Sequence, residues 1–448
     1  VCHYAVMNNA ARDALLVGSA SCLCYFLIYF TRTPIMMLPS SITAETFWEF
    51  GNTKVSFQQA LSLTFQVGFA LGKFPAIYVI SSKFFFANKL KVLLALNIGA
   101  AGFVGVPYAI GRQPAFAVGG LLLSAVVASA VYGGFATYLE GRRSTEAIFA
   151  AMNFSFIFAG SASRGTASAV LEAGVSPELM PAVIAGAVVP GICGLLVMLD
   201  RSPKPAAADV SARGKRSPMS AEERSAFVRS YGPGIVLVIL AYTLITAIRQ
   251  YRDMFSRNLM TAANGGVTPV SAFFFFVDLP GAVVAMLACG LMVRVKDNST
   301  ALLWMLGVMA TSFTGLILST VAFQNGLING ELWQSIVGMS IFSAYVFPAG
   351  PFYDRLVGAA GVSGTCSFLI FISDLCGYSG TLGLLFYSIF EGSSASGAVY
   401  LDQFVAAVYV LGGITVASIL CCFWYFASVF NGKSVADKGE LAAVYNKL

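Results

Sequence analysis

The sequence has few charged residues and a single histidine. Of its 448 residues 11% are charged, whereas a soluble domain of this length carries about a quarter. So few charges cannot cover the surface of a water-soluble body, which excludes a cytosolic enzyme. The only histidine, His3, excludes histidine metal sites and catalysis by serine–histidine or cysteine–histidine pairs. We therefore expect no metal, no cofactor and no enzyme activity.

Cysteine chemistry and nucleotide or nucleic-acid binding are not indicated either. The nine cysteines are an odd number, and all but Cys2 lie in apolar stretches, which is typical of small buried or lipid-facing side chains. There is no Walker A loop, and the glycines at 99, 102 and 105 lie in an apolar run, which indicates close helix packing. Basic residues do not cluster with aromatic ones in a soluble segment, so nucleic acid is not an expected partner.

Long apolar runs dominate the sequence instead. Hydrophobic residues make up 57% of the chain, and its mean hydropathy is +0.78. Many runs reach 18 residues, enough to cross about 30 Å of hydrocarbon as a helix. They predict twelve transmembrane helices, over about residues 14–38, 57–80, 92–111, 115–138, 147–171, 177–199, 233–254, 269–292, 300–322, 332–351, 362–389 and 400–430.

The spacing of these runs predicts the domain organisation. Two six-helix halves joined by a long polar loop are typical of the major facilitator architecture, an all-α membrane fold of two pseudo-symmetric six-helix bundles. We expect bundles at 1–199 and 233–430, a basic linker at 200–232 and a tail at 431–448. The linker is either an ordinary connection between domains or a binding site for anionic lipid or a partner.

The distribution of lysine and arginine predicts the orientation. If the N-terminus is cytoplasmic, most of the 27 lysines and arginines fall in cytoplasmic segments, as the positive-inside rule requires. Both termini of this multi-pass protein are therefore expected on the cytoplasmic side or on the equivalent side of an organelle.

Arginines in two predicted spans indicate a binding site, because an ionisable residue in a bilayer costs several kcal/mol. In the first span Tyr25, Tyr29 and Arg32 are spaced to share one helical face. The seventh span repeats the pattern with Tyr242 and Arg249. Two such arginines, facing each other between the halves, would offer forked donors to a phosphate or carboxylate. The alternative is that both extend to the outer membrane interface.

Further charges within the spans extend this site or form ion pairs. They are Lys73, Arg164, Arg252, Asp253, Asp278 and Asp374. Lys73 and Asp278 occupy corresponding positions in the two halves, as do Arg164 and Asp374, and neutralising ion pairs are one interpretation. With Arg32 and Arg249 the set is net positive, which attracts anions. A carboxylate pair of Asp278 and Asp374 for acid–base chemistry is a weaker alternative, because neither lies in a catalytic motif.

A short loop after the fourth span carries charges of alternating sign. Glu140, Arg142 and Arg143 are predicted to form an ion-pair latch that holds one transport state closed. The alternative is a solvated turn in which Ser144 or Thr145 caps the fifth helix.

Three segments resemble the organophosphate:phosphate antiporter branch of the major facilitators. They are Tyr29-Phe30-Thr31-Arg32, Gly68-Phe69-Ala70-Leu71-Gly72-Lys73-Phe74 and Ile248-Arg249-Gln250-Tyr251-Arg252-Asp253. The resemblance implies that Arg32 and Arg249 bind phosphate, that Lys73 lines the same pore, and that Arg164 is a further basic pore residue. Together with residues 139–146, the chain also looks similar to an uncharacterised relative of that branch, over about the first 260 residues. The loop at 81–89 lacks the glycine and the acid of the superfamily's gating motif.

The sequence therefore leads to two functional hypotheses. The first is a secondary transporter of a small anion, a phosphate ester or organic anion, that works by alternating access and antiport. Its predicted ligands are Arg32, Arg249, Lys73, Arg164, Tyr25, Tyr29 and Tyr242. The second is a non-transporting scaffold or accessory subunit of a larger membrane complex, in a cell or organelle membrane, which the altered 81–89 loop and the 37 phenylalanines favour. The expected partners are a small anion and the lipid bilayer, with partner subunits only in the second case.

Overall fold

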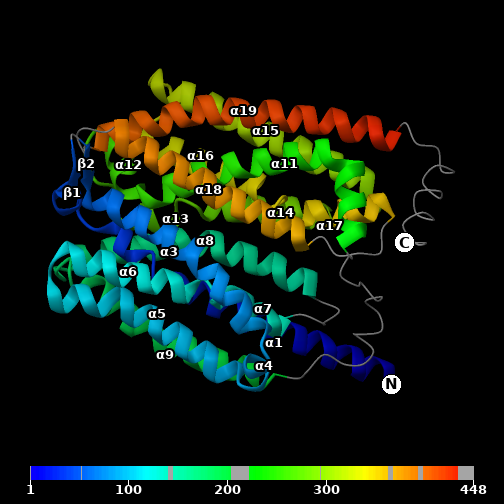
Figure 1. The fold of residues 1–448 in the computed structure, drawn as a ribbon, viewed down its shortest axis with the longest axis horizontal. Helices are drawn as coiled ribbons and strands as arrows, with labels where there is room; N and C mark the ends of the chain where they lie inside the picture. The colour runs from blue at the N-terminus through cyan, green and yellow to red at the C-terminus, as the bar shows by residue number, and fades with distance from the viewer. Residues whose placement is uncertain are drawn as a thin grey trace. The chain divides into compact units, whose positions relative to one another are not determined.

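The computed structural model describes residues 2–51, 53–139, 145–202, 221–292, 294–361, 367–391 and 397–431, most of them in helices (Figure 1). The elements up to the linker are α1 (Cys2–Tyr29), η1 (Pro34–Met37), α2 (Ser40–Thr43), β1 (Thr46–Phe50), β2 (Thr53–Ser56), α3 (Phe57–Ser81), α4 (Lys83–Ala87), α5 (Lys89–Gly111), α6 (Pro114–Ala128), α7 (Val131–Leu139), α8 (Thr145–Glu172) and α9 (Met180–Asp200).

The elements after the linker are also helical. They are α11 (Ala221–Met254), α12 (Ser256–Ala263), α13 (Ser271–Phe276), α14 (Leu279–Met292), α15 (Asn298–Gln324), α16 (Gly330–Tyr345), α17 (Pro351–Ala360), α18 (Ser367–Glu391) and α19 (Gly397–Asn431). Within the described residues, nine helical stretches are long and apolar enough to cross a membrane. The other three predicted spans fall on α1, α8 and α16. The predicted all-α membrane fold is thus confirmed, while the side on which the termini lie stays a prediction.

Several predicted spans differ in detail from the helices. The α11 helix begins at Ala221 instead of about residue 233, so the end of the predicted linker is helical, and α16 ends at Tyr345 instead of about residue 351. The first helix ends at Tyr29 rather than at residue 38, ahead of Pro34, which cannot donate a helical hydrogen bond and whose ring clashes with the preceding helical turn. The span 115–138 is divided between α6 and α7, where the Ser129 hydroxyl donates to the Val126 carbonyl at 2.7 Å. The span 269–292 is divided ahead of Pro280, which cannot donate a helical hydrogen bond.

By compactness the chain divides into two units. Unit 1 comprises Val1–Arg213, Asp253–Leu279 and Leu385–Leu401, and unit 2 comprises Gly214–Arg252, Pro280–Leu384 and Asp402–Leu448. The adjacent residues Arg252 and Asp253 therefore belong to different units. The division into sequential halves, 1–199 and 233–430, stays a prediction, and residues 203–220 of the linker and 432–448 of the tail lie outside the described residues.

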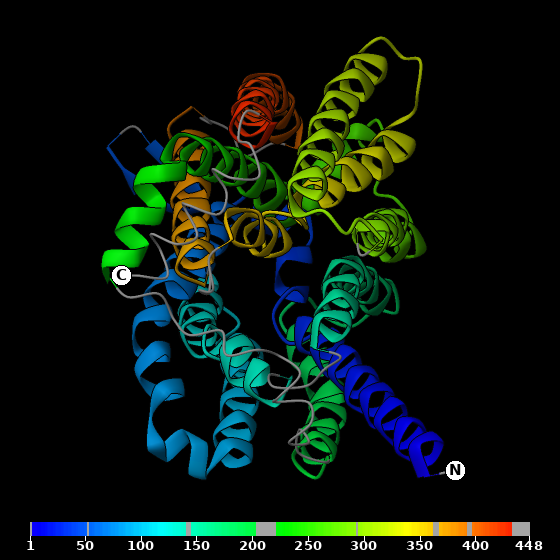
Figure 2. The ribbon, with the colours of Figure 1, turned by 90° about the vertical axis from the view of Figure 1, so that its right-hand side faces the viewer.

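Each unit has its own helix packing. In unit 1, α5 packs along α6 and α9, and α1 packs along α8 and α9 (Figure 1). In unit 2, α15 lies beside α16 and α17 (Figure 2). A Cβ atom at Gly105 would lie 2.7 Å from the Cα of Ala182, so the glycine allows the close approach of α5 and α9. The predicted packing role of the glycine run is confirmed at this position.

A β-hairpin between α1 and α3 was not expected from the sequence. β1 pairs antiparallel with β2, and Glu49 forms an ion pair with Lys54 at 3.3 Å across the strands. The Ser56 side chain and Gln59 form a capping box that starts α3. The hairpin thus fixes where α3, which carries Lys73, begins.

Candidate functional site

Arg32 lies in the turn after α1 and is held by aromatic rings of unit 1. Its guanidinium carbon is 4.3 Å from the centre of the Tyr29 ring, 5.6 Å from that of Phe69 and 5.9 Å from that of Phe65. Within the described part of the chain, no carboxylate lies within ion-pair distance of Arg32. The side chain is half-buried. Ring faces attract a cation without neutralising it, so the positive charge of Arg32 persists.

The predicted pore lysine lies near the same aromatic group. Lys73 is one helical turn after Phe69 on α3, and its Nζ is 5.3 Å from the centre of the Phe69 ring. A Cβ atom at Gly72 would overlap the backbone of Val126, so this part of α3 packs closely against α6. The structure therefore brings Arg32 and Lys73, two of the predicted ligands, to a single phenylalanine.

Tyr25 and Tyr29 are part of the aromatic packing in unit 1. The Tyr25 ring lies 5.8 Å from that of Tyr29 and 5.5 Å from that of Tyr132, measured between centres. The prediction that Arg32 shares a helical face with the two tyrosines is wrong, because Arg32 follows the end of α1. Its guanidinium nevertheless contacts Tyr29. The contact is made through the turn instead.

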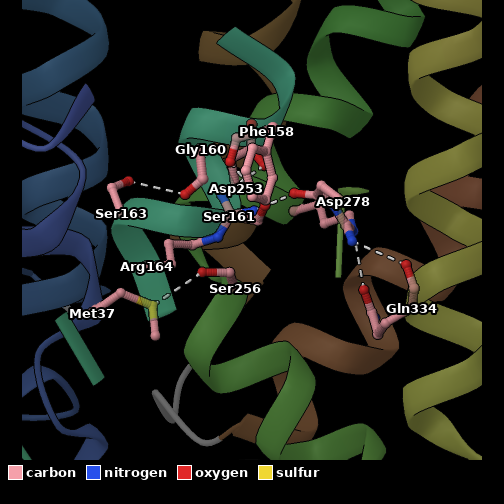
Figure 3. A network of polar contacts seen from close by, with 11 residues as sticks. Met37, Phe158, Gly160, Ser161, Ser163, Arg164, Asp253, Ser256, Asp278 and Gln334 are labelled. Atoms are coloured by element: carbon pink, nitrogen blue, oxygen red, sulfur yellow. Dashed lines mark hydrogen bonds and ion pairs between the residues drawn. The ribbon is translucent and has the colours of Figure 1, made fainter. Parts of the chain in front are cut away.

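Arg164 forms a buried ion-pair network with two carboxylates of unit 1 (Figure 3). Its Nη1 donates to Oδ1 of Asp253 at 3.1 Å, and its Nη2 donates to Oδ2 of Asp278 at 2.5 Å. The side chains of Arg164 and Asp278 are 1% exposed, and that of Asp253 is 22% exposed. A buried guanidinium needs such partners, because removing a charge from water costs several kcal/mol. The guanidinium of Arg164 is thus paired with two carboxylates of the protein.

Local sequence explains how Asp278 reaches Arg164. Gly165, the next residue on α8, has no side chain, and a Cβ atom there would overlap Phe275 of α13. α13 can therefore lie directly against α8. The chain then turns after Phe276 and places Asp278 ahead of α14, beside the guanidinium of Arg164. The sequence comparison of the two halves matched Asp278 with Lys73 by position and did not indicate Arg164 as its partner.

Arg249 lies in a polar and aromatic cluster of unit 2. Its guanidinium carbon is 4.5 Å from the centre of the Tyr345 ring. The Tyr242 hydroxyl donates to Oδ1 of Asp374 at 2.9 Å and lies 3.1 Å from the Tyr345 hydroxyl, and the two tyrosine rings stack with centres 5.4 Å apart. The buried Thr246 hydroxyl has no hydrogen-bond partner among the described residues. The cluster thus combines a cation, a carboxylate and hydroxyl groups.

Tyr345 is the member of this cluster that sequence reasoning missed. It lies in an apolar run of the tenth predicted span, with no charge or spacing pattern to distinguish it from core tyrosines. By contrast, Tyr242, Thr246 and Arg249 recur at helical spacing on α11, which is continuous there. Only packing against α16 could identify Tyr345.

Arg252 donates hydrogen bonds to both the side chain and the backbone carbonyl of Gln334 in unit 2. Its Nε donates to Oε1 of Gln334 and its Nη2 donates to the Gln334 carbonyl, each at 3.0 Å. Its side chain is buried. The predicted latch residues Glu140, Arg142 and Arg143 lie outside the described residues, so their ion pairing stays a prediction. Among the residues that the structure describes, no group of three or more His, Cys, Asp or Glu side chains could hold a metal ion.

Comparisons with known proteins identify the family and the fold. The model of a family described as "Family of unknown function (DUF5690)" matches residues 41–429, well beyond the first 260 residues over which the motifs indicated a family likeness. No curated protein matches the sequence.

Solved structures of transporters are similar to most of the chain. The nucleoside transporter NupG is 13% identical, with 90% of this chain and 98% of NupG covered and a TM-score of 0.56. A bacterial homolog of the human lysosomal transporter Spinster is 14% identical (94% and 98% covered, TM-score 0.58). The POT family transporter PepTSo is 10% identical (94% and 99% covered, TM-score 0.60). The predicted major facilitator fold is confirmed, whereas the organophosphate branch stays a prediction.

Proposed function

The chain belongs to the DUF5690 family of unknown function, and we propose that it is a secondary transporter of a small anion. The proposed substrate is a phosphate ester or another organic anion, and the mechanism is alternating access between two bundles of a major facilitator fold. In this proposal both termini lie on the cytoplasmic side, or on the equivalent side of an organelle.

The environment of Arg32 carries the proposal. Its guanidinium rests on the rings of Tyr29, Phe65 and Phe69, and no carboxylate of the described residues neutralises it. A guanidinium stacked on rings uses its flat faces, while its N–H groups point outward from the edge. An anion with two oxygens is the ligand that such a fork binds best.

Roles for the other predicted ligands follow from their contacts. Arg249 supplies the second guanidinium, and Lys73, which shares Phe69 with Arg32, adds positive charge. The hydroxyls of Tyr25, Tyr29 and Tyr242 are proposed donors to the anion. Because the single O–H proton of Tyr242 is donated to Asp374 in this structure, Tyr242 must give up that hydrogen bond to donate to the anion.

The ion-pair network of Arg164 has a different role in the proposal. Because Asp253 and Asp278 already occupy the guanidinium, an anion would have to displace a carboxylate to bind Arg164. We therefore assign Arg164, Asp253 and Asp278 to joining α8 to the C-terminal end of α11 and to the turn between α13 and α14, and Arg252 to anchoring α11 on α16. Antiport follows if the empty, positively charged site resists reorientation until a second anion neutralises it.

Exchange in proteoliposomes tests the transporter proposal. Purified protein is reconstituted with internal glycerol 3-phosphate, and uptake of external radiolabelled phosphate is measured. We expect exchange by the wild type and a loss of about 10- to 100-fold in Arg32→Gln or Arg249→Gln, because a hydrogen bond to a charged group contributes about 1.5–3 kcal/mol. Arg112→Gln, at an exposed arginine after α5, is the control. Exchange that survives loss of both arginines rules out the anion site.

The same preparation distinguishes the alternative function. A non-transporting subunit would show no exchange with any anion and would migrate on a native gel in a stoichiometric assembly. A transporter would exchange and would be active without other subunits.

A further inference from the structure

A surface groove runs along α5 in unit 1, away from the contacts of Arg32. It has a volume of about 440 Å³, and its lining is almost wholly apolar. We call it the α5 groove and define it by Asn88 at the N-cap of α5, by Lys91, Ala95, Gly99 and Phe103 along one face of the helix, and by Val127 of α6. The spacing of three to four residues places the α5 members in a single row. The groove therefore follows the helix axis.

Glycine forms the floor of this groove. A Cβ atom at Gly99 would meet only Phe103 and Val127, both at 3.9 Å, so no side chain fills the space above it. Gly102 has no neighbour within 4 Å, and Gly105 packs against Ala182. The sequence interpretation of all three glycines as helix-packing residues therefore holds for Gly105 but is wrong for Gly99, which keeps the groove open.

One end of the groove is basic. Lys91 is exposed, and within the described residues no carboxylate lies at ion-pair distance from it. The neighbouring Lys89 is engaged elsewhere, since its Nζ donates to the Thr137 carbonyl at 3.3 Å and lies 5.3 Å from the centre of the Tyr138 ring. Lys91 also lies in the first turn of α5, where the helix dipole favours an anion.

The length of the groove suits one leaflet of a bilayer. The apolar part of the lining, from Val92 to Phe103, rises about 16 Å along the helix at 1.5 Å per residue. Half of a hydrocarbon core is about 15 Å, so this apolar part matches the thickness of one leaflet. The positive-inside rule predicts that Lys91 lies at the cytoplasmic surface, where anionic lipids concentrate.

We propose that the α5 groove binds an acyl chain of an anionic phospholipid whose phosphate contacts Lys91. The apolar lining from Val92 to Phe103 contacts the acyl chain, and the ammonium group of Lys91 provides the selectivity for an anionic headgroup. Gly99 is required because any larger side chain would occupy the position of the acyl chain. The lipid site is independent of the proposed anion transport.

Photo-crosslinking tests the proposal at residue level. Purified full-length protein in detergent is incubated with phosphatidylglycerol that carries a diazirine in its acyl chain, and crosslinked peptides are mapped by mass spectrometry. We expect labelling of α5 in the wild type that unlabelled phosphatidylglycerol displaces about fivefold better than phosphatidylcholine, since one lysine near an anionic surface contributes about this factor. Lys91→Gln should remove that preference.

Gly99→Leu fills the groove and should reduce α5 labelling more than tenfold. Gly102→Leu is the matched control, because it adds the same side chain to the same helix in open space. Ala95→Leu fills the groove at an exposed position and serves if Gly99→Leu fails to fold. The proposal is overturned if a correctly folded groove-filling variant shows the same α5 labelling as the wild type. It is also overturned if Lys91→Gln keeps the preference for phosphatidylglycerol over phosphatidylcholine. A wild-type dimer that dissociates in these variants would instead assign the groove to a second copy of the chain.

Discussion

Arg164 and Arg32 belong to the same unit, yet their charges are handled in opposite ways. Arg164 is fully buried and divides its donors between Asp253 and Asp278. Arg32 is half-buried and rests on three aromatic rings with no acid of the described residues beside it. The first arrangement satisfies the cation within the protein, whereas the second holds the cation and leaves its charge for a ligand. An arginine in a span is therefore informative about binding only when its partners are known.

Removing the buried cation should have the largest effect. Arg164→Gln removes the buried guanidinium that pairs with both Asp253 and Asp278, and we expect a loss of about 3–5 kcal/mol in stability. Thermal unfolding in detergent measures it. The double variant Arg164→Gln with Asp278→Asn should recover part of the loss, because it also removes the buried negative charge that Arg164 neutralised. An unchanged melting temperature in the single variant would show that the ion pairs of Arg164 do not stabilise the packing of α8.

Substitution of Arg32, the arginine that contacts aromatic rings, should reduce transport much more than stability. Arg32→Gln is expected to cost about 1 kcal/mol of stability, the contribution of a cation–π contact, while exchange falls about 10- to 100-fold. Arg32→Lys keeps the charge but loses the fork and should fall in between. Melting curves and exchange rates, measured on the same preparation of each variant, compare its loss of stability with its loss of exchange. A stability loss as large as that of Arg164→Gln would contradict the distinction between the two arginines.

Gly165→Ala tests how the ion-pair network is positioned. The added methyl group would overlap Phe275, so α13 must shift away from α8 and carry Asp278 with it. We expect a destabilisation of about 1–3 kcal/mol, typical of overpacking. Gly160→Ala, on the same helix with its nearest neighbour at 3.7 Å, is the control. Equal melting temperatures for the two variants would refute the role of Gly165.

The smallest effect is expected at Tyr345 in unit 2. Tyr345→Phe removes only the hydroxyl next to Tyr242 and should cost about 0.5–1.5 kcal/mol, with little change in exchange. Tyr345→Leu also removes the ring under Arg249, so it should weaken exchange several-fold more than the phenylalanine variant. If both variants transport alike, the ring does not position Arg249.

Sequence patterns were reliable where they depend on helical period and composition. The apolar runs predicted the membrane helices, and the spacing of Tyr242 and Arg249 predicted a face that α11 presents intact. They were less reliable at helix ends. Arg32 was placed on a helix, but Pro34 ends α1 earlier, and its contact with Tyr29 is made through a turn.

Partner choice could not be read from the sequence. Corresponding positions in the two halves matched Arg164 with Asp374, whereas the acids that contact Arg164 are Asp253 and Asp278, and Asp374 accepts from Tyr242. The residues that contact one another are 89 and 114 positions apart for the two ion pairs. Chain spacing carries no information on such distances.

The sequence by itself determined that this protein is a bundle of membrane helices with several costly charges inside it, because the bilayer imposes the length and apolarity of a span on the local sequence. Only the tertiary structure decided which charges are neutralised and which are held on aromatic rings. That outcome depends on helices such as α8 and α13 approaching closely at Gly165, and close approach is a property of packed surfaces rather than of any one segment.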